Sequence, residues 1–124
     1  MNQWIYLTVG GIAGTLGRYI LSGLVYQRMG TNFPYGTLVV NVLGCLIVGF
    51  LDVIFEEKFL LAPNMRLLLM VGFCGAFTTF STFVLETSNL IKDGQTWLAL
   101  GNVLVSVVIG FMAFRLGMFL GEII

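Results

Sequence analysis

The amino-acid sequence predicts an all-helical membrane protein with four transmembrane helices. Apolar residues make up 58% of the 124 residues and charged residues only 10%, whereas roughly a quarter of a soluble domain is charged. The apolar residues fall into four stretches, each near the roughly 20 residues with which a helix crosses a bilayer. They cover residues 4–26, 37–55, 67–91 and 97–120, and we assign the whole chain, 1–124, to one transmembrane domain.

The first stretch, residues 4–26, follows an N-terminus without the basic residues of a signal peptide, so we expect it to remain as a membrane helix. Gly10 and Gly14 form a GxxxG motif, which allows a neighbouring helix to approach closely. We expect helices one, two and four to pack tightly through such glycines. Arg18 lies in the second half of this stretch, where a cation either anchors the helix at the interface or raises the local anion concentration at a pore mouth.

The second and fourth stretches each carry a row of polar residues. Thr37 and Asn41 share one helical face, and Asn102 and Ser106 share another, which Gly110 continues. Polar side chains are costly in hydrocarbon, so these residues should face the bundle interior, where they either bridge helices or line a path. Because several such residues occur, we favour a path.

The third stretch, residues 67–91, contains the segment GAFTTFSTF at residues 75–83. Gly75 weakens a helix, and the hydroxyls of Thr78, Thr79, Ser81 and Thr82 can bond to nearby backbone. We expect the helix to break near residues 75–79 and to restart, with a simple kink as the alternative.

A broken helix exposes backbone groups that can bind ions. The restarted helix presents its positive dipole end, and the freed carbonyls can hold a cation. Phe80 and Phe83 share one face of the restarted helix, while Thr79, Thr82 and Glu86 form a neighbouring stripe. Glu86 is the only carboxylate well inside an apolar stretch, so it either belongs to this site or reaches back to the nearby interface.

The basic residues predict insertion in both orientations. The side that holds the N-terminus also collects Lys58, Arg66 and Arg115. The opposite side collects Arg28 and Lys92, and Arg18 as well if its side chain reaches that interface. The positive-inside rule therefore has almost no asymmetry on which to act. Our hypothesis is an antiparallel homodimer, and the alternative is a fixed topology set by the folding context.

The composition also excludes several classes of function. The chain has no histidine, which removes histidine-based triads, Cys/His zinc sites and haem ligation through histidine. Cys45 and Cys74 lie inside apolar stretches, where packing is the expected role of a free thiol. The net charge is zero and the basic residues form no run, so we expect no nucleic-acid partner. We also expect no enzyme, because no nucleophile and base have a recognisable spacing.

Three ordered motifs carry a resemblance to a known family. They are Gly10-Gly11 through Gly14 to Arg18-Tyr19, GTLVVNVLG at residues 36–44, and GFCGAFTTFSTF at residues 72–83. In these motifs, and over essentially its whole length, the sequence resembles the Fluc (CrcB) family of bacterial fluoride channels.

This resemblance implies an antiparallel dual-topology homodimer in the bacterial inner membrane, with two fluoride pores at the subunit interface. It makes Phe80 and Phe83 the rings that face the ion and Asn41 the amide donor of the pore. The backbone carbonyls of Gly75 and Thr78 are expected to hold a structural sodium ion at the dimer centre. The remaining residues expected along the fluoride path are Ser81, Thr82, Ser106 and Glu86.

The chemistry of fluoride agrees with these assignments. Fluoride is small and strongly hydrated, so its entry requires hydrogen-bond donors that replace water. The positive edges of phenyl rings add a weak attraction that does not prevent release. A passive channel can export the anion, because the membrane potential supplies about 2.3 kcal/mol per 100 mV. The fourth stretch departs from the family's longer row of hydroxyls, since Ser106 is followed along its row by Gly110 and Phe114.

Two other classes of function remain open. A small multidrug exporter that exchanges protons for cations is also a compact four-helix dimer, but it requires an acid in its first helix, where this chain has Arg18. A non-transporting assembly subunit accounts for the glycines but not for the break with its rings. The exporter is the alternative that we retain.

Overall fold

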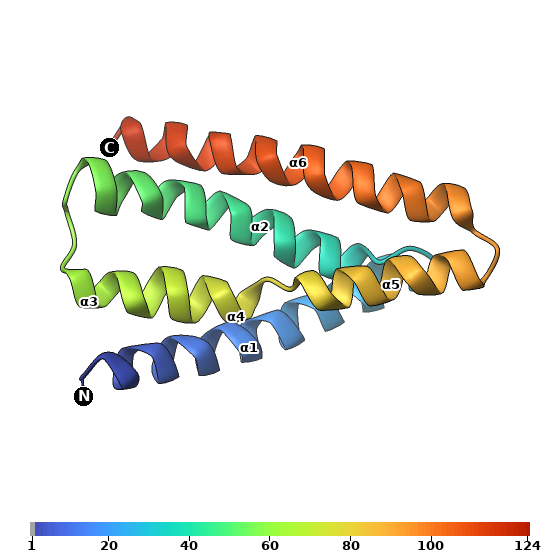
Figure 1. Ribbon diagram of the computed structural model, residues 1–124, viewed down its shortest axis with the longest axis horizontal. Coiled ribbons are helices and arrows are strands. Elements are labelled where there is room, and N and C mark those ends of the chain that lie inside the picture. Colours follow the sequence, from blue (N-terminus) through green and yellow to red (C-terminus); the bar gives the residue numbers. More distant parts are fainter. Residues whose placement is uncertain (1) are drawn as a thin grey trace.

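The computed structural model describes residues 2–124 and is built from helices, as the sequence predicts (Figure 1). The four long segments begin and end within a few residues of the predicted stretches. The elements are α1 (Asn2–Met29), α2 (Tyr35–Asp52), the π-helical turn η1 (Val53–Glu57), α3 (Pro63–Arg66), the π-helical stretch η2 (Leu67–Cys74), α4 (Gly75–Phe77), α5 (Phe80–Lys92) and α6 (Thr96–Glu122).

Three segments of the described chain are long and apolar enough to cross a membrane, namely Tyr35–Glu57, Pro63–Lys92 and Thr96–Glu122. The chain is therefore a multi-pass membrane protein. The fourth predicted span lies in α1, which has 28 residues but is made less apolar by its glycines and by Arg18. Its crossing of the bilayer stays a prediction.

Glycines bring the backbones of α2 and α6 close together, and the two helices run side by side in Figure 1. A Cβ atom added to Gly117 of α6 would lie 2.9 Å from the Phe50 amide nitrogen and 3.0 Å from the Leu46 carbonyl carbon. A Cβ atom on Gly49 of α2 would lie 2.9 Å from the carbonyl carbon of Phe114. Only glycine fits at such a close approach of two backbones.

The GxxxG motif of α1 contacts the third segment rather than helices two and four. A Cβ atom on Gly10 would lie 2.9 Å from the Phe73 nitrogen and 3.1 Å from the Cα of Gly72. One on Gly14 would lie 3.0 Å from the Phe77 nitrogen. Gly72 gives η2 a matching small surface on which α1 packs, so the first helix uses its glycines against the third segment, a contact that the sequence did not predict.

Thr78 and Thr79 lie between α4 and α5 in extended conformation. The φ and ψ angles are −95° and 158° at Thr78, and −150° and 118° at Thr79. The amide of Thr82 donates to Thr79 Oγ1 at 3.3 Å, which caps the N-terminus of α5. Figure 1 shows this connection as a short stretch without helix inside the third segment.

Candidate functional site

The side chain of Asn41 binds the backbone of the extended stretch. Its Nδ2 donates to the carbonyl oxygen of Thr79 at 3.0 Å, and the amide of Thr79 donates to Asn41 Oδ1 at 2.8 Å. A carboxamide nitrogen carries two hydrogens, so one remains beyond the bond to Thr79. One turn along α2, Gly44 leaves space for the methyl group of Thr78, which a Cβ atom at this position would overlap.

Arg18 contacts the end of α4. Its Nε donates to the carbonyl oxygen of Ala76 at 3.0 Å, and the side chain is half-buried. A cation at the C-terminal end of a helix interacts favourably with the helix dipole. Arg18 therefore lies next to the extended residues. It contacts the helix end that precedes them in the chain, whereas the capped start of α5 follows them.

Phe80 and Phe83 form a pair of rings on the first turn of α5. Their centroids lie 5.8 Å apart at an interplanar angle of 48°. Phe80 is 77% exposed, whereas Phe83 is half-buried. A cavity of about 300 Å³ opens beside Phe80 and is lined by Asn41, Gly44, Cys45, Val48, Thr78, Thr79, Phe80 and Phe114.

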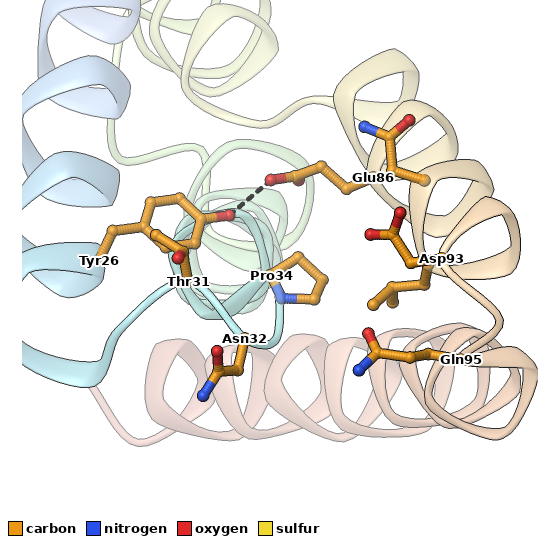
Figure 2. Close-up of a pocket in the computed structure, with 9 residues that line it drawn as sticks. Tyr26, Thr31, Asn32, Pro34, Glu86, Asp93 and Gln95 are labelled. Carbon is orange, nitrogen blue, oxygen red and sulfur yellow. Dashed lines mark hydrogen bonds between the residues drawn. The ribbon is translucent and has the colours of Figure 1, made fainter.

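Glu86 joins three helices. The Tyr26 hydroxyl of α1 donates to Glu86 Oε2 at 2.6 Å, and the Thr37 hydroxyl of α2 donates to Glu86 Oε1. Glu86 is half-buried and is bonded to two neighbouring helices. Figure 2 shows the Tyr26–Glu86 hydrogen bond at the edge of a polar cavity of about 540 Å³. Its other lining residues are Thr31, Asn32, Pro34, Asn89, Leu90, Asp93 and Gln95.

A chain of hydrogen bonds connects α6 to α5. Ser106 Oγ donates to Asn102 Oδ1 at 3.4 Å, Asn102 Nδ2 donates to Thr87 Oγ1 at 2.9 Å, and Thr87 Oγ1 donates to the carbonyl oxygen of Phe83 at 2.7 Å. Asn102 is only 1% exposed. The polar row of α6 therefore bridges two helices, and through Thr87 it reaches the backbone of the ring pair.

The backbone at Gly75 and Thr78 meets one requirement of a cation site. In a continuous helix the amide of Thr79 would donate to the carbonyl of Gly75, but here it donates to Asn41. The carbonyl of Gly75 therefore loses its helical donor, at a residue that is exposed. Carbonyl oxygens are suitable ligands for a hard cation. Among residues 2–124, no group of three or more cysteine, aspartate and glutamate side chains could hold a metal ion.

The candidate residues are spread over separate cavities of the single chain. Asn41 and Phe80 line the cavity beside the extended stretch, Glu86 lines the polar cavity of Figure 2, and Phe83 lines a third cavity on α5. Ser81 is exposed and Thr82 half-buried next to the rings.

Sequence reasoning did not include Tyr26 among the candidate site residues. Tyr26 lies 60 positions from Glu86, and no local pattern points to its bond with that carboxylate.

We expect Tyr26→Phe to lower the thermal stability of the protein. The change removes the hydroxyl that donates to Glu86 and leaves the ring in place, and loss of a hydrogen bond to a half-buried charged group costs about 1–3 kcal/mol. The measurement is the unfolding temperature in detergent. Tyr35→Phe is the matched control, because no hydrogen bond of the Tyr35 hydroxyl is found among the described residues. Equal unfolding temperatures for both variants would contradict this role of Tyr26.

Comparisons with known proteins identify the family. A family model described as CrcB-like protein, Camphor Resistance (CrcB), matches residues 5–118. A protein of Maridesulfovibrio salexigens named Fluoride-specific ion channel FluC is 44% identical over 124 residues, which cover 100% of this chain and 98% of the relative. A protein of the same name from Geobacter sp. (strain M21) is 47% identical over 108 residues, which cover 87% of each chain. The chain therefore belongs to the CrcB family.

Proposed function

We propose that the protein is a fluoride channel through which fluoride leaves the cytoplasm passively across the bacterial inner membrane. The observation that carries this proposal is the full-length similarity to proteins named fluoride-specific ion channels, at 44% identity over 124 residues. The membrane potential drives an anion outward with about 2.3 kcal/mol per 100 mV, so the channel needs no other energy source.

The residues around the extended stretch suit a small, strongly hydrated anion. The second Nδ2 hydrogen of Asn41 and the hydroxyls of Ser81 and Thr82 are donors that can replace water. The Ser106 hydroxyl can join them when it turns away from Asn102 Oδ1, to which it donates at 3.4 Å. Phe80 and Phe83 present ring edges, which attract an anion weakly and release it easily. These groups together form the proposed fluoride path.

The mouth of this path is the polar cavity beside Glu86. Its volume of about 540 Å³ is large enough for a hydrated ion. In this proposal Glu86, held by Tyr26 and Thr37, lines the entrance, while Arg18 supplies positive charge near the extended stretch.

The complete channel is proposed to be an antiparallel homodimer in which α1 is the fourth membrane span. Three features support a second copy: the balanced basic residues, the spread of candidate residues over separate cavities, and the exposure of Phe80, at 77%. A partner that covers Phe80 would bring the rings of one chain to the polar residues of the other and so complete two pores.

The interruption at Thr78 and Thr79 has a second role in this proposal. A sodium ion at the centre of the dimer would be held by the carbonyls of Gly75 and Thr78 from both copies. Such an ion neutralises the negative ends of the half-helices that meet there. It is structural rather than transported.

The proposed orientation is tested by labelling the C-terminus. We expect Ile124→Cys, at a residue that is 72% exposed, to react with a membrane-impermeant thiol reagent in about half of the molecules of intact cells, because the two orientations are equal. Permeabilised cells are the control and should give complete labelling. Labelling of all molecules from one side only would contradict dual topology.

The function is tested by fluoride efflux from liposomes. Purified protein is reconstituted into vesicles loaded with potassium fluoride, valinomycin carries the balancing potassium, and an electrode records the fluoride released. We expect rapid efflux without proton movement, and no efflux from vesicles without protein. Absence of fluoride efflux would contradict the channel, and proton movement driven by a cationic drug would favour the exporter.

A further inference from the structure

We propose that Asn41 and Arg18 are positioning residues that hold the third segment open at Thr78 and Thr79. Each side chain comes from a neighbouring helix. Each replaces a hydrogen-bond partner that a backbone group has lost where the helix is interrupted. The conformational part of this inference is independent of the transported ion, and only its effect on flux rests on the proposed fluoride function.

The hydrogen bonds at the extended stretch account for the groups that leave the helix. In a continuous helix the amide of Thr79 bonds to the carbonyl of Gly75, and the amide of Phe80 bonds to the carbonyl of Ala76. Here the Thr79 amide donates to Asn41 Oδ1 at 2.8 Å, and the Ala76 carbonyl accepts from Arg18 Nε at 3.0 Å.

The carboxamide of Asn41 acts as a peptide group from another helix. It offers one acceptor and one donor side by side, and Thr79 uses both, at 2.8 and 3.0 Å. This is the paired bonding of two residues in adjacent antiparallel strands. Thr78 and Thr79 have β-branched side chains, which favour the extended backbone that such pairing requires.

The energetic reason for two such side chains is the surrounding lipid. A backbone group at membrane depth that has no partner costs several kcal/mol wherever water does not replace the missing bond. Without Asn41 and Arg18, the Thr79 amide and the Ala76 carbonyl regain partners when the segment closes into a continuous helix. The two side chains therefore bias an equilibrium between an open and a closed third segment toward the open form.

Closure would move the functional side chains of α5. A residue advances by about 3.3 Å in extended conformation and by about 1.5 Å in a helix, so closure of Thr78 and Thr79 would draw α5 toward α4 by about 4 Å. That shift exceeds the length of a hydrogen bond, so Glu86 would separate from Tyr26, to which it is bonded at 2.6 Å. Asn41 and Arg18 thus determine the position along the bundle of both the Phe80–Phe83 ring pair and Glu86.

The first test measures the backbone of Thr79 directly. Threonine-labelled protein in fluoride-free bicelles reports whether Thr79 has strand-like carbon shifts and how fast its amide exchanges with solvent. In Asn41→Ala we expect either loss of the strand-like shifts or exchange at least about tenfold faster, which corresponds to loss of about 1.4 kcal/mol of protection. Asn64→Ala, at an exposed asparagine of α3, is the matched control and should resemble the wild type.

A second variant separates positioning from direct contact with the anion. Asn41→Asp retains an acceptor for the Thr79 amide, but it lacks the donor to the Thr79 carbonyl and places a negative charge beside the path. We therefore expect slower exchange of the Thr79 amide than in Asn41→Ala, together with loss of fluoride flux. If Asn41 only contacts the anion, Asn41→Ala will leave the shifts and exchange of Thr79 unchanged while flux falls. That result would overturn the positioning role and leave the fluoride function intact.

The contribution of Arg18 has its own readout. Arg18→Met removes the donor to Ala76 and retains an unbranched stem in place of the arginine's aliphatic part, so the carbonyl ¹³C resonance of Ala76 should shift. Arg115→Met, at an exposed arginine of α6, is the control and should leave that resonance in place. An unchanged Ala76 resonance in Arg18→Met would remove Arg18 from the proposal.

Discussion

Fluoride efflux through Phe80→Ile and Phe83→Ile variants is expected to be at least about tenfold slower than through the wild type. The two rings lie 5.8 Å apart at 48° on the first turn of α5. Isoleucine retains an apolar side chain but lacks the positive ring edge that attracts an anion. A tenfold loss corresponds to about 1.4 kcal/mol on the barrier, which is within the range of aromatic edge interactions.

A phenylalanine outside the proposed path controls for the loss of an aromatic ring. Phe111 of α6 is 64% exposed and lines neither the Asn41 nor the Glu86 cavity. Phe111→Ile should therefore retain wild-type efflux. Size-exclusion chromatography should give the same elution volume for all three variants and the wild type, because isoleucine retains an apolar side chain at each position. Wild-type rates in both Phe80→Ile and Phe83→Ile would exclude the rings from the path.

Hydropathy, together with residues that end helices, predicts the helices of this protein well. In lipid every backbone group needs a hydrogen-bond partner, and a helix supplies these partners within its own segment, so long apolar stretches become helices and their lengths follow the bilayer. The predicted helix α1 is also present, although its glycines and Arg18 lower its hydropathy and it is not among the three apolar spans. The π-helical turns η1 and η2 have no such signal in the sequence.

Partners of individual residues could not be read from the sequence. The GxxxG motif shows that α1 has a small face, but not that Gly72 lies opposite Gly10. The position of Asn41 in an apolar stretch predicts a buried polar role, but its bonds to the Thr79 backbone depend on where that backbone leaves the helix. Local patterns identify which side chains need partners, and the packing of distant helices decides which partners they find.

The packing of α2 against α6 should depend on Gly117 more than on any single apolar side chain in their contact. In Gly117→Ala the new methyl group would lie 2.9 Å from the Phe50 nitrogen and 3.0 Å from the Leu46 carbonyl carbon, and closer still to the Leu46 oxygen. These are backbone atoms that no rotamer change can move, so the helices must separate. We expect destabilisation of at least about 3 kcal/mol, the upper part of the range for overpacking.

The measurement is the fraction of folded protein that survives a temperature series in detergent. Gly101→Ala on the same helix is the matched control, since a Cβ atom at Gly101 meets no atom within 4 Å. Alanine is the better helix former by about 1 kcal/mol, so this control should be as stable as the wild type or more stable. If Gly117→Ala instead gains stability together with Gly101→Ala, helix propensity rather than backbone contact governs position 117, and the close approach of α2 and α6 is not required for folding.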